Sequence, residues 1–205
     1  MPHSKPSLSS RLMWRLLGWL FRVKGWRVEG RAPDLPKFII VGAPHTSNWD
    51  FVFFAGAVEQ LGIEPSFIGK HTLFRWPLRR FMYDMGGMPV DRSKPGGYVR
   101  SVIRGFEQAG RMALVIAPEG TRGSTGKWRS GFYHIAMGAQ VPIVPAWVDH
   151  QRMVGGMGDP VMPTGDYRAD MLRLLAYYRR VMPRCPRWDV LEASLPPGGE
   201  GSAGG

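Results

Sequence analysis

The sequence predicts one α/β domain, in which a mixed and mostly parallel central sheet is flanked by helices. Short apolar runs alternate along the chain with segments of helical periodicity, and this alternation is typical of such sheets. Several apolar runs also end in loops of polar residues and glycine, which is where α/β proteins bind ligands. A length of 205 residues suits one such domain with a substantial core.

The composition is strongly basic. Lysine and arginine number 27 against 16 aspartate and glutamate residues, which gives a formal net charge of +11. This excess suits an anionic partner, such as nucleic acid, an anionic membrane or a phosphorylated substrate. The single cysteine, Cys185, excludes an internal disulfide framework and a multi-cysteine metal site, and it fits a reducing compartment.

Residues 8–28 carry bulky apolar side chains interrupted by arginine and lysine, so no uninterrupted run reaches the roughly 20 residues that span a bilayer. On a helix, Arg11, Arg15 and Arg22 fall within an arc of about 60° and leave a wide apolar face with tryptophan. This pattern predicts an amphipathic helix in the membrane interface. The alternative is a helix that packs on the core with its arginines in water.

Three regions are expected: a basic membrane-associating segment, a folded domain and a disordered tail, at residues 1–30, 31–190 and 191–205. Within the domain, strands are expected at residues 38–41, 65–69, 88–90, 112–117 and 141–148. Helices are expected at residues 49–61, 74–83, 98–109, 131–138 and 167–181. Two prolines in the last strand predict that it lies at an edge of the sheet or is irregular.

His45 is the first candidate for chemistry. It follows the apolar run at residues 38–41, which a glycine and a proline end, and it precedes the helix expected at residues 49–61. It therefore lies just beyond the carboxyl end of a buried strand. Ligands of open α/β sheets bind at this position.

Asp50 would lie in the first turn of that helix, from where its carboxylate could reach back to the His45 imidazole. A carboxylate there would fix the tautomer of the ring and stabilise its charged form, as in a general base with an orienting acid. A simpler interpretation is that Ser47 or Asn48 caps the helix and Asp50 interacts favourably with its positive end. The histidine would then be an ordinary loop residue.

Arg92 follows the short strand expected at residues 88–90, so it would lie on the same side of the sheet as His45. Its guanidinium is a planar and permanently charged fork that matches phosphate oxygens. The alternative is a salt bridge with the neighbouring Asp91 or plain solvent exposure.

A third loop, with the sequence PEGTRG, follows the strand expected at residues 112–117. Gly120 frees the backbone so that amides can approach a ligand. Thr121 and Arg122 supply donors for an oxyanion or a phosphate, and Glu119 adds a carboxylate. The alternative is a surface turn with a charged tip.

Four motifs in this order resemble those of the glycerolipid acyltransferases, the family typified by 1-acylglycerol-3-phosphate acyltransferase. They are an H-x-x-x-x-D block, a glycine followed by an apolar run and an arginine, an E-G-T-R block and a V-P-I-V-P block, at residues 45–50, 86–92, 119–122 and 141–145. The resemblance covers residues 38–149, so the domain expected at residues 31–190 would be an acyltransferase domain.

The resemblance implies a role for each candidate residue. His45, oriented by Asp50, would remove the proton from an acceptor hydroxyl, and the oxygen would attack the carbonyl of an acyl thioester directly, without an acyl-enzyme. The acceptor would be held, with the arginines on its phosphate, by Arg92, Glu119, Gly120, Thr121 and Arg122. Further candidates for the site are Ser47, Asn48 and Lys70.

The implied reaction transfers a fatty acyl chain to the hydroxyl of a lysophospholipid, foremost 1-acylglycerol-3-phosphate, which gives phosphatidic acid. The alternative acceptors are other lipid hydroxyls, such as those of a lyso-ornithine lipid, a glycolipid or another lysophospholipid. The co-substrate would be acyl-CoA or acyl-carrier protein, and the basic surface suits the acidic carrier. No cofactor and no metal are expected.

The N-terminal segment predicts a peripheral or monotopic position on the cytoplasmic face of an anionic membrane. No nucleic-acid partner is expected, because no recognised binding motif accompanies the basic residues. Two other classes stay open. A nucleic-acid-binding protein should show steep salt dependence, and a membrane-associated protein that keeps the fold without catalysis should bind anionic vesicles and turn over nothing.

Overall fold

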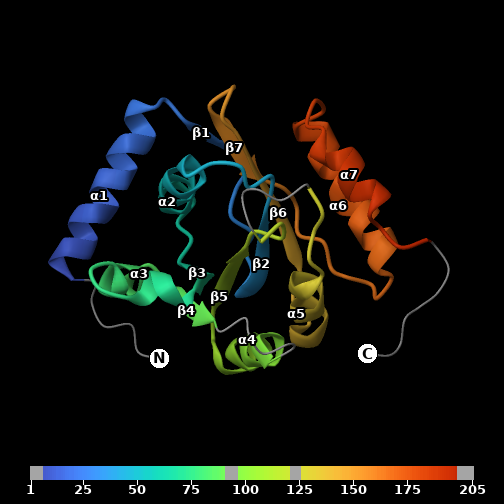
Figure 1. Cartoon of the computed structure of the whole chain (residues 1–205), viewed down its shortest axis with the longest axis horizontal. Helices are drawn as coiled ribbons and strands as arrows, with labels where there is room; N and C mark the ends of the chain where they lie inside the picture. The colour runs from blue at the N-terminus through green and yellow to red at the C-terminus, as the bar shows by residue number, and fades with distance from the viewer. Residues whose placement is uncertain (1–6, 91–96, 121–125, 198–205) are drawn as a thin grey trace.

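A computed structural model describes residues 7–90, 97–120 and 126–197. Within these ranges the strands form one seven-stranded sheet with the order β1-β7-β6-β2-β5-β3-β4 (Figure 1). Neighbouring strands are parallel except for β6 and β7. The strands are β1 (Arg27–Glu29), β2 (Lys37–Gly42), β3 (Pro65–Lys70), β4 (Gly87–Val90), β5 (Met112–Ile116), β6 (Ile143–Asp149) and β7 (Val154–Met157). The mixed, mostly parallel sheet expected from the sequence is confirmed.

Helices cover both faces of the sheet (Figure 1). On one face lie α1 (Leu8–Val23), α2 (Trp49–Leu61) and α3 (Arg79–Asp84), with a 3₁₀ turn, η1 (His71–Phe74). Against the other face pack α4 (Gly97–Gln108), α5 (Gly131–Ala139), α6 (Tyr167–Val181) and α7 (Arg187–Ala193). The helices α2 and α6 have the bounds that the sequence pattern predicts.

The central strand β2 shows why its sequence reads as an unbroken apolar run. Ile39 and Val41 are fully buried in the core shared with α4 to α7, whereas Phe38 and Ile40 point to the opposite face. Successive strand residues alternate between faces, so a strand covered on both sides needs apolar side chains throughout. Full burial of one such side chain contributes about 1.5–3 kcal/mol, and β2 is therefore a rigid platform for the loop that follows it.

Two elements differ from the sequence prediction for a proline-related reason. The helix expected at residues 74–83 begins only at Arg79, because Pro77 disfavours helical backbone at the residue before it. The strand after residue 141 was expected to lie at an edge or to be irregular; β6 is not at an edge, since it pairs with both β2 and β7, but its pairing on the β7 side is irregular. Pro145 falls between the β7 ladder, which starts at Ala146, and an isolated bridge at Ile143, so its missing N–H interrupts no regular ladder.

The packed domain extends beyond residues 31–190 at both ends. Trp26 is buried, and β1 forms one edge of the sheet by pairing with β7. At the other end, Leu191 and Leu195 are buried with the core of α6. Among the described residues, no helix combines the length and the hydropathy needed to cross a membrane.

Candidate active site

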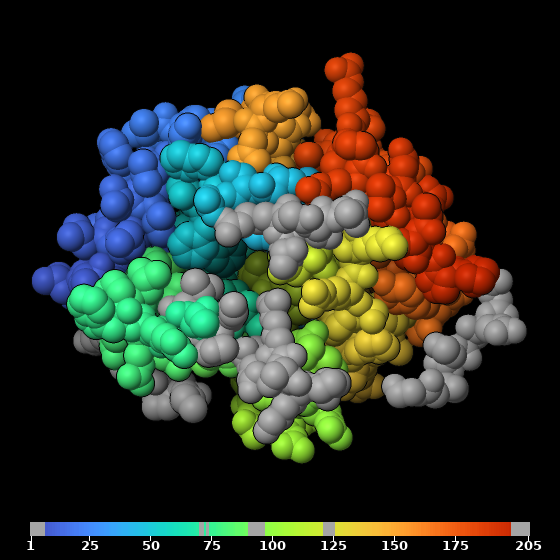
Figure 2. All heavy atoms as spheres, in the orientation of Figure 1, coloured from blue at the N-terminus to red at the C-terminus, as the bar shows by residue number. Residues whose placement is uncertain are grey.

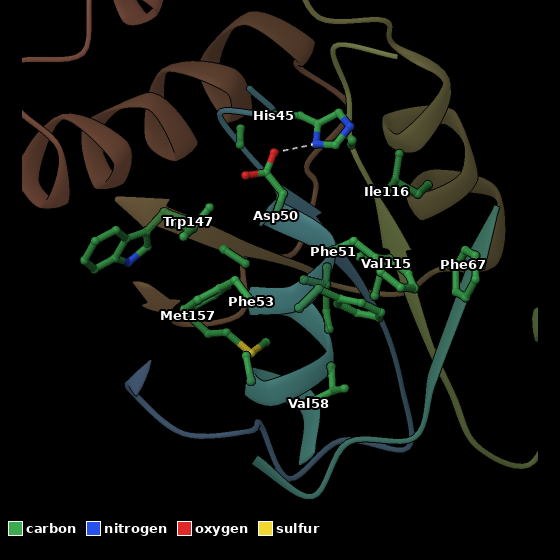
Figure 3. Close-up of a pocket in the computed structure, with 18 of the residues that line it drawn as sticks. His45, Asp50, Phe51, Phe53, Val58, Phe67, Val115, Ile116, Trp147 and Met157 are labelled. Carbon is green, nitrogen blue, oxygen red and sulfur yellow. Dashed lines mark ion pairs between the residues drawn. The ribbon is translucent and has the colours of Figure 1, made fainter. Parts of the chain in front are cut away.

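The loop between β2 and α2 brings the two residues of the first motif together. His45 Nδ1 lies 2.8 Å from Asp50 Oδ2, and the dashed line in Figure 3 marks this ion pair. The same carboxylate oxygen accepts hydrogen bonds from the backbone amides of Thr46 and Ser47 at 2.9 and 3.0 Å. Asp50 therefore closes the loop on itself, and the imidazole is held against a carboxylate that the backbone keeps in place.

Capping of α2 by a polar side chain does not account for this loop. Asn48 occupies the N-cap position, and its side chain makes no capping hydrogen bond. The Ser47 hydroxyl accepts a hydrogen bond of 3.1 Å from the Trp49 amide. Both residues shape the turn, but it is Asp50 that joins the turn to the histidine.

The environment of Asp50 favours its charged form. Burial alone would raise its pKa, but hydrogen bonds from His45, the Ser47 amide and His150 together hold the pKa below its ordinary value. An ionised carboxylate only accepts hydrogen bonds, so the Nδ1 atom of His45 must carry the proton. The Nε2 atom then has a free lone pair, and it points away from Asp50. With one third of the His45 side chain exposed, this atom is placed to act as a base.

His150 is a second histidine on the same carboxylate, and the sequence patterns did not indicate it. Its Nε2 atom lies 2.5 Å from Asp50 Oδ1. His150 directly follows β6, which runs parallel to β2 beside it, so the two histidines lie at the same edge of the sheet. The position of His150 just after a predicted strand was visible in the sequence. It indicates a contact with Asp50 only once β6 is known to lie beside β2.

Glu119 joins the site from the opposite side, at the end of β5. Its Oε1 atom accepts a hydrogen bond of 3.2 Å from the His45 amide, and its Oε2 atom lies 2.6 Å from Arg187 Nη1. Burial raises the pKa of Glu119, although the His45 amide and the Arg187 charge oppose this. The Glu119 side chain has no exposed surface, so this geometry suits support of the His45 loop better than the direct acceptor contact expected from the sequence.

Arg187 is the other residue that sequence reasoning missed. It begins α7, 68 residues after Glu119, and no local pattern marks it. Gly120, next to Glu119, has a φ of +75°, which favours glycine. A side chain there would meet the Arg129 guanidinium. Glu119 and Gly120 therefore each lie beside an arginine.

Several expected residues lie outside the part of the chain that the structure describes. These are Arg92, Thr121 and Arg122. The backbone of Lys70 ends β3, whose carboxyl end lies at the same edge of the sheet as that of β2. The structure thus brings together His45, Asp50, Glu119 and Gly120 from the expected set.

A cavity of about 340 Å³ opens beside the His45–Asp50 pair. Apart from this pair, most of its lining is apolar and comes from α2, β2, β3, β5, β6 and β7 (Figure 3). Prominent lining residues are Phe51, Phe54, Val58, Phe67, Val115 and Met157. Within the described residues, no group of three or more histidine, cysteine or carboxylate side chains is arranged to hold a metal ion.

The fold and the site define an α/β enzyme with a histidine–aspartate pair beside an apolar cavity at the carboxyl ends of its strands. A family model described as Acyltransferase matches residues 26–149, and the chain belongs to this family. His45, Asp50 and Glu119 lie inside the matched range, whereas His150 and Arg187 lie outside it.

The names of similar proteins agree with the assignment to this family. The chain is 28% identical over 189 residues to the 1-acyl-sn-glycerol-3-phosphate acyltransferase of Salmonella typhimurium, covering 82% of this chain and 75% of the relative. It is 28% identical over 187 residues to that of Escherichia coli, with 80% and 74% covered. The crystal structure of the 1-acyl-sn-glycerophosphate acyltransferase from Thermotoga maritima shares the fold, with a TM-score of 0.58 and 23% identity over 92% of this chain and 81% of that chain.

Proposed function

We propose that this acyltransferase moves a fatty acyl chain from an acyl thioester to the free hydroxyl of 1-acylglycerol-3-phosphate, which gives phosphatidic acid. The observation that carries the proposal is the His45–Asp50 pair at the edge of an apolar cavity. The acceptor follows the names of the Salmonella and Escherichia relatives.

In the proposed reaction the acceptor hydroxyl gives its proton to His45 Nε2 while its oxygen attacks the thioester carbonyl. The carbon–sulfur bond of the resulting tetrahedral intermediate then breaks, and the thiolate leaves with the proton that the imidazolium returns. The ionised Asp50 stabilises the imidazolium between these two steps. The enzyme is unchanged after the cycle, so no acyl-enzyme forms.

The cavity suits the acyl chain of the donor. Its aromatic and aliphatic lining on α2 extends from Phe51, next to Asp50, to Leu61 at the end of the helix. Each methylene buried there contributes about 0.8 kcal/mol. The thioester carbonyl would then lie at the cavity edge beside His45, with the apolar tail inside.

The acceptor phosphate would bind at the same edge of the sheet. Arg92 and Arg122 remain our candidates for its oxygens, because β5, which precedes Arg122, neighbours β2, and β4, which precedes Arg92, ends at the same edge of the parallel strands. Glu119 would act by holding the His45 amide. Both acyl-CoA and acyl-carrier protein remain candidate donors, and the net charge of +11 favours an acidic carrier.

The membrane contact would be made by α1, which packs on α2 and lies on the outside of the molecule (Figure 2). Phe21 fills a notch at Gly56, where a side chain on α2 would clash with its ring. The opposite stripe of α1 is exposed and apolar, at Leu8, Leu12, Leu16 and Trp19. Arg11, Arg15 and Arg22 lie along one side of this stripe, so we propose peripheral binding to the cytoplasmic face of an anionic membrane.

The direct test gives purified enzyme a radiolabelled long-chain acyl thioester, on CoA or on acyl-carrier protein, and a panel of acceptors. We expect transfer to 1-acylglycerol-3-phosphate and little transfer to the matching unphosphorylated monoacylglycerol. Equal transfer to both would remove the phosphate-binding role of the arginines while keeping the chemistry. A wild-type enzyme that acylates no lipid hydroxyl would contradict the proposed function.

A further inference from the structure

We propose that His150 is a positioning residue for acyl transfer, because it fixes the second oxygen of the carboxylate that orients His45. This inference rests on the proposed function for its kinetic test. The hydrogen bond between His150 and Asp50 can also be tested without turnover, because it requires one tautomer of the His150 ring.

The two oxygens of Asp50 are held in different ways. Oδ2 accepts hydrogen bonds from the His45 ring and from the amides of Thr46 and Ser47. Oδ1 accepts one from His150 Nε2 at 2.5 Å, and no other described residue donates to it. Hydrogen bonds to Oδ2 alone would let the carboxylate group rotate about that atom. The bond to Oδ1 removes that freedom and sets the plane in which the imidazole of His45 must lie.

The His150 ring is itself held firmly. It lies at the end of β6, and its ring centre is 5.9 Å from that of Trp26 in an edge-to-face arrangement. Trp26 in turn packs on Phe53 of α2 and Phe21 of α1. Edge-to-face contacts of this kind favour one ring orientation. His150 thus connects Asp50 to the end of β6 and to the packed ring of Trp26.

The ionised Asp50 carboxylate implies the tautomers that the inference requires. Because the ionised Asp50 only accepts hydrogen bonds, His150 must carry its proton on Nε2, whereas His45 must carry its proton on Nδ1. The two histidines therefore donate to the same carboxylate, His45 through Nδ1 and His150 through Nε2. Only His45 keeps the Nε2 lone pair that removes a proton.

The kinetic consequence should fall on kcat. His150 does not line the apolar cavity, so its removal should leave the KM for the acyl donor unchanged. Loss of one hydrogen bond to a charged group, with three others retained, predicts a fall in kcat of about tenfold for His150→Leu. His150→Gln keeps an N–H donor at a similar reach, and we expect its kcat to recover to within about threefold of wild type. His134→Leu, at an exposed position of α5, is the matched control and should leave kcat unchanged.

A double-mutant cycle separates positioning from a general structural role. In the Asp50→Asn background, His150→Leu should cause little further loss, because His150 acts through that carboxylate. An equal loss in both backgrounds, or a wild-type kcat for His150→Leu, would overturn the proposal. Thermal unfolding of each variant shows whether it is folded.

A second measurement does not depend on activity. Long-range ¹⁵N–¹H spectra of the wild-type histidine rings, assigned with His45→Ala and His150→Gln, report the tautomers directly. We expect Nδ1–H for His45 and Nε2–H for His150. The opposite tautomer at His150 would contradict the inference even if acyl transfer is established. The expected tautomers, found in an enzyme that acylates nothing, would instead count against the proposed function alone.

Discussion

The two faces of the sheet are built differently. The face under α4 to α7 is filled by one large cluster of side chains, whereas the face under α1 and α2 has smaller clusters and a cavity of about 340 Å³. Ile39 and Ile40 make the contrast clear, because these neighbours on β2 have the same side chain and point to opposite faces. The filled face stabilises the strand, and the hollow face leaves room for a substrate. The residues that we assign to chemistry lie at the edge that joins the two.

The largest expected effect is a loss of kcat at the carboxyl edge of the sheet, where Asp50 lies, without a change in either face. Asp50→Asn should lower kcat by a hundredfold to a thousandfold, because the amide cannot hold the His45 tautomer and stabilise its charge. The KM for the acyl donor should change little, since the cavity stays intact. Steady-state kinetics with varied acyl chain length measures both quantities. A large change in KM with a normal kcat would show that Asp50 serves the cavity instead.

The matched pair Ile39→Ala and Ile40→Ala tests the contrast between the faces. Ile39→Ala should lower the free energy of unfolding by about 2–5 kcal/mol, because it opens a hole in a filled core. Ile40→Ala should cost roughly 2 kcal/mol, at the low end of that range, because mainly the transfer free energy is lost where a cavity already borders the side chain. Urea denaturation gives both values.

The same pair should differ in the opposite sense in substrate preference. Ile40→Ala enlarges the cavity, so the preferred acyl chain should become longer, while Ile39→Ala should keep the wild-type preference. Competition between acyl thioesters of different length measures the shift. Equal losses of stability, or a shift caused by Ile39→Ala, would mean that the two faces are not distinct in the way described.

A smaller effect on stability and kcat is expected where α7, from the filled face, contacts the active site. Arg187, on α7, is ion-paired with Glu119, whose side chain has no exposed surface. Arg187→Met should lower stability by about 1–3 kcal/mol and also lower kcat, because the carboxylate that holds the His45 amide loses a charged partner. The control is Arg179→Met, which removes exposed ion pairs with Asp189 and Glu192 and should cost less than about 1 kcal/mol. A kcat unchanged by Arg187→Met would make the contact purely structural.

The smallest effect is a pH dependence of stability. The pKa of Asp50 is lowered in the folded state, so its contribution is present above the unfolded value of about 3.9 and is lost as pH falls through the folded pKa. The stability difference between wild type and Asp50→Asn should therefore be larger at pH 7 than at pH 3. Denaturation at the two pH values tests this. A difference that grows toward acid pH would contradict the assigned direction.

Local sequence patterns predicted the parts of the site that lie within one motif. His45 and Asp50 are five residues apart, and a strand, a short loop and a helix of predictable bounds place them together. Glu119 could be placed because its strand end was recognisable. In each of these cases hydrophobic periodicity and turn residues carry the information.

The supporting residues could not be found in this way. His150 is 100 residues from Asp50 and Arg187 is 68 residues from Glu119. Their contacts depend on the order of the strands and on the docking of α7, which no local pattern specifies. The interior position of β6 illustrates the same limit, because its prolines predicted an edge or an irregular strand and could not decide between the two. Periodicity also showed an apolar face on α2 without showing that this face borders a cavity.

The central claim is that His45 removes the acceptor proton in a direct transfer. The decisive measurement is the initial rate of acyl transfer by His45→Ala and wild type, with thermal unfolding to establish that both are folded and intact-mass analysis of each during turnover. We predict a loss of about a thousandfold or more for the variant, with an unchanged unfolding midpoint and no covalent acyl group on either protein. A folded His45→Ala variant with near wild-type activity, or a wild-type acyl-enzyme that forms and decays at the turnover rate, would contradict the claim.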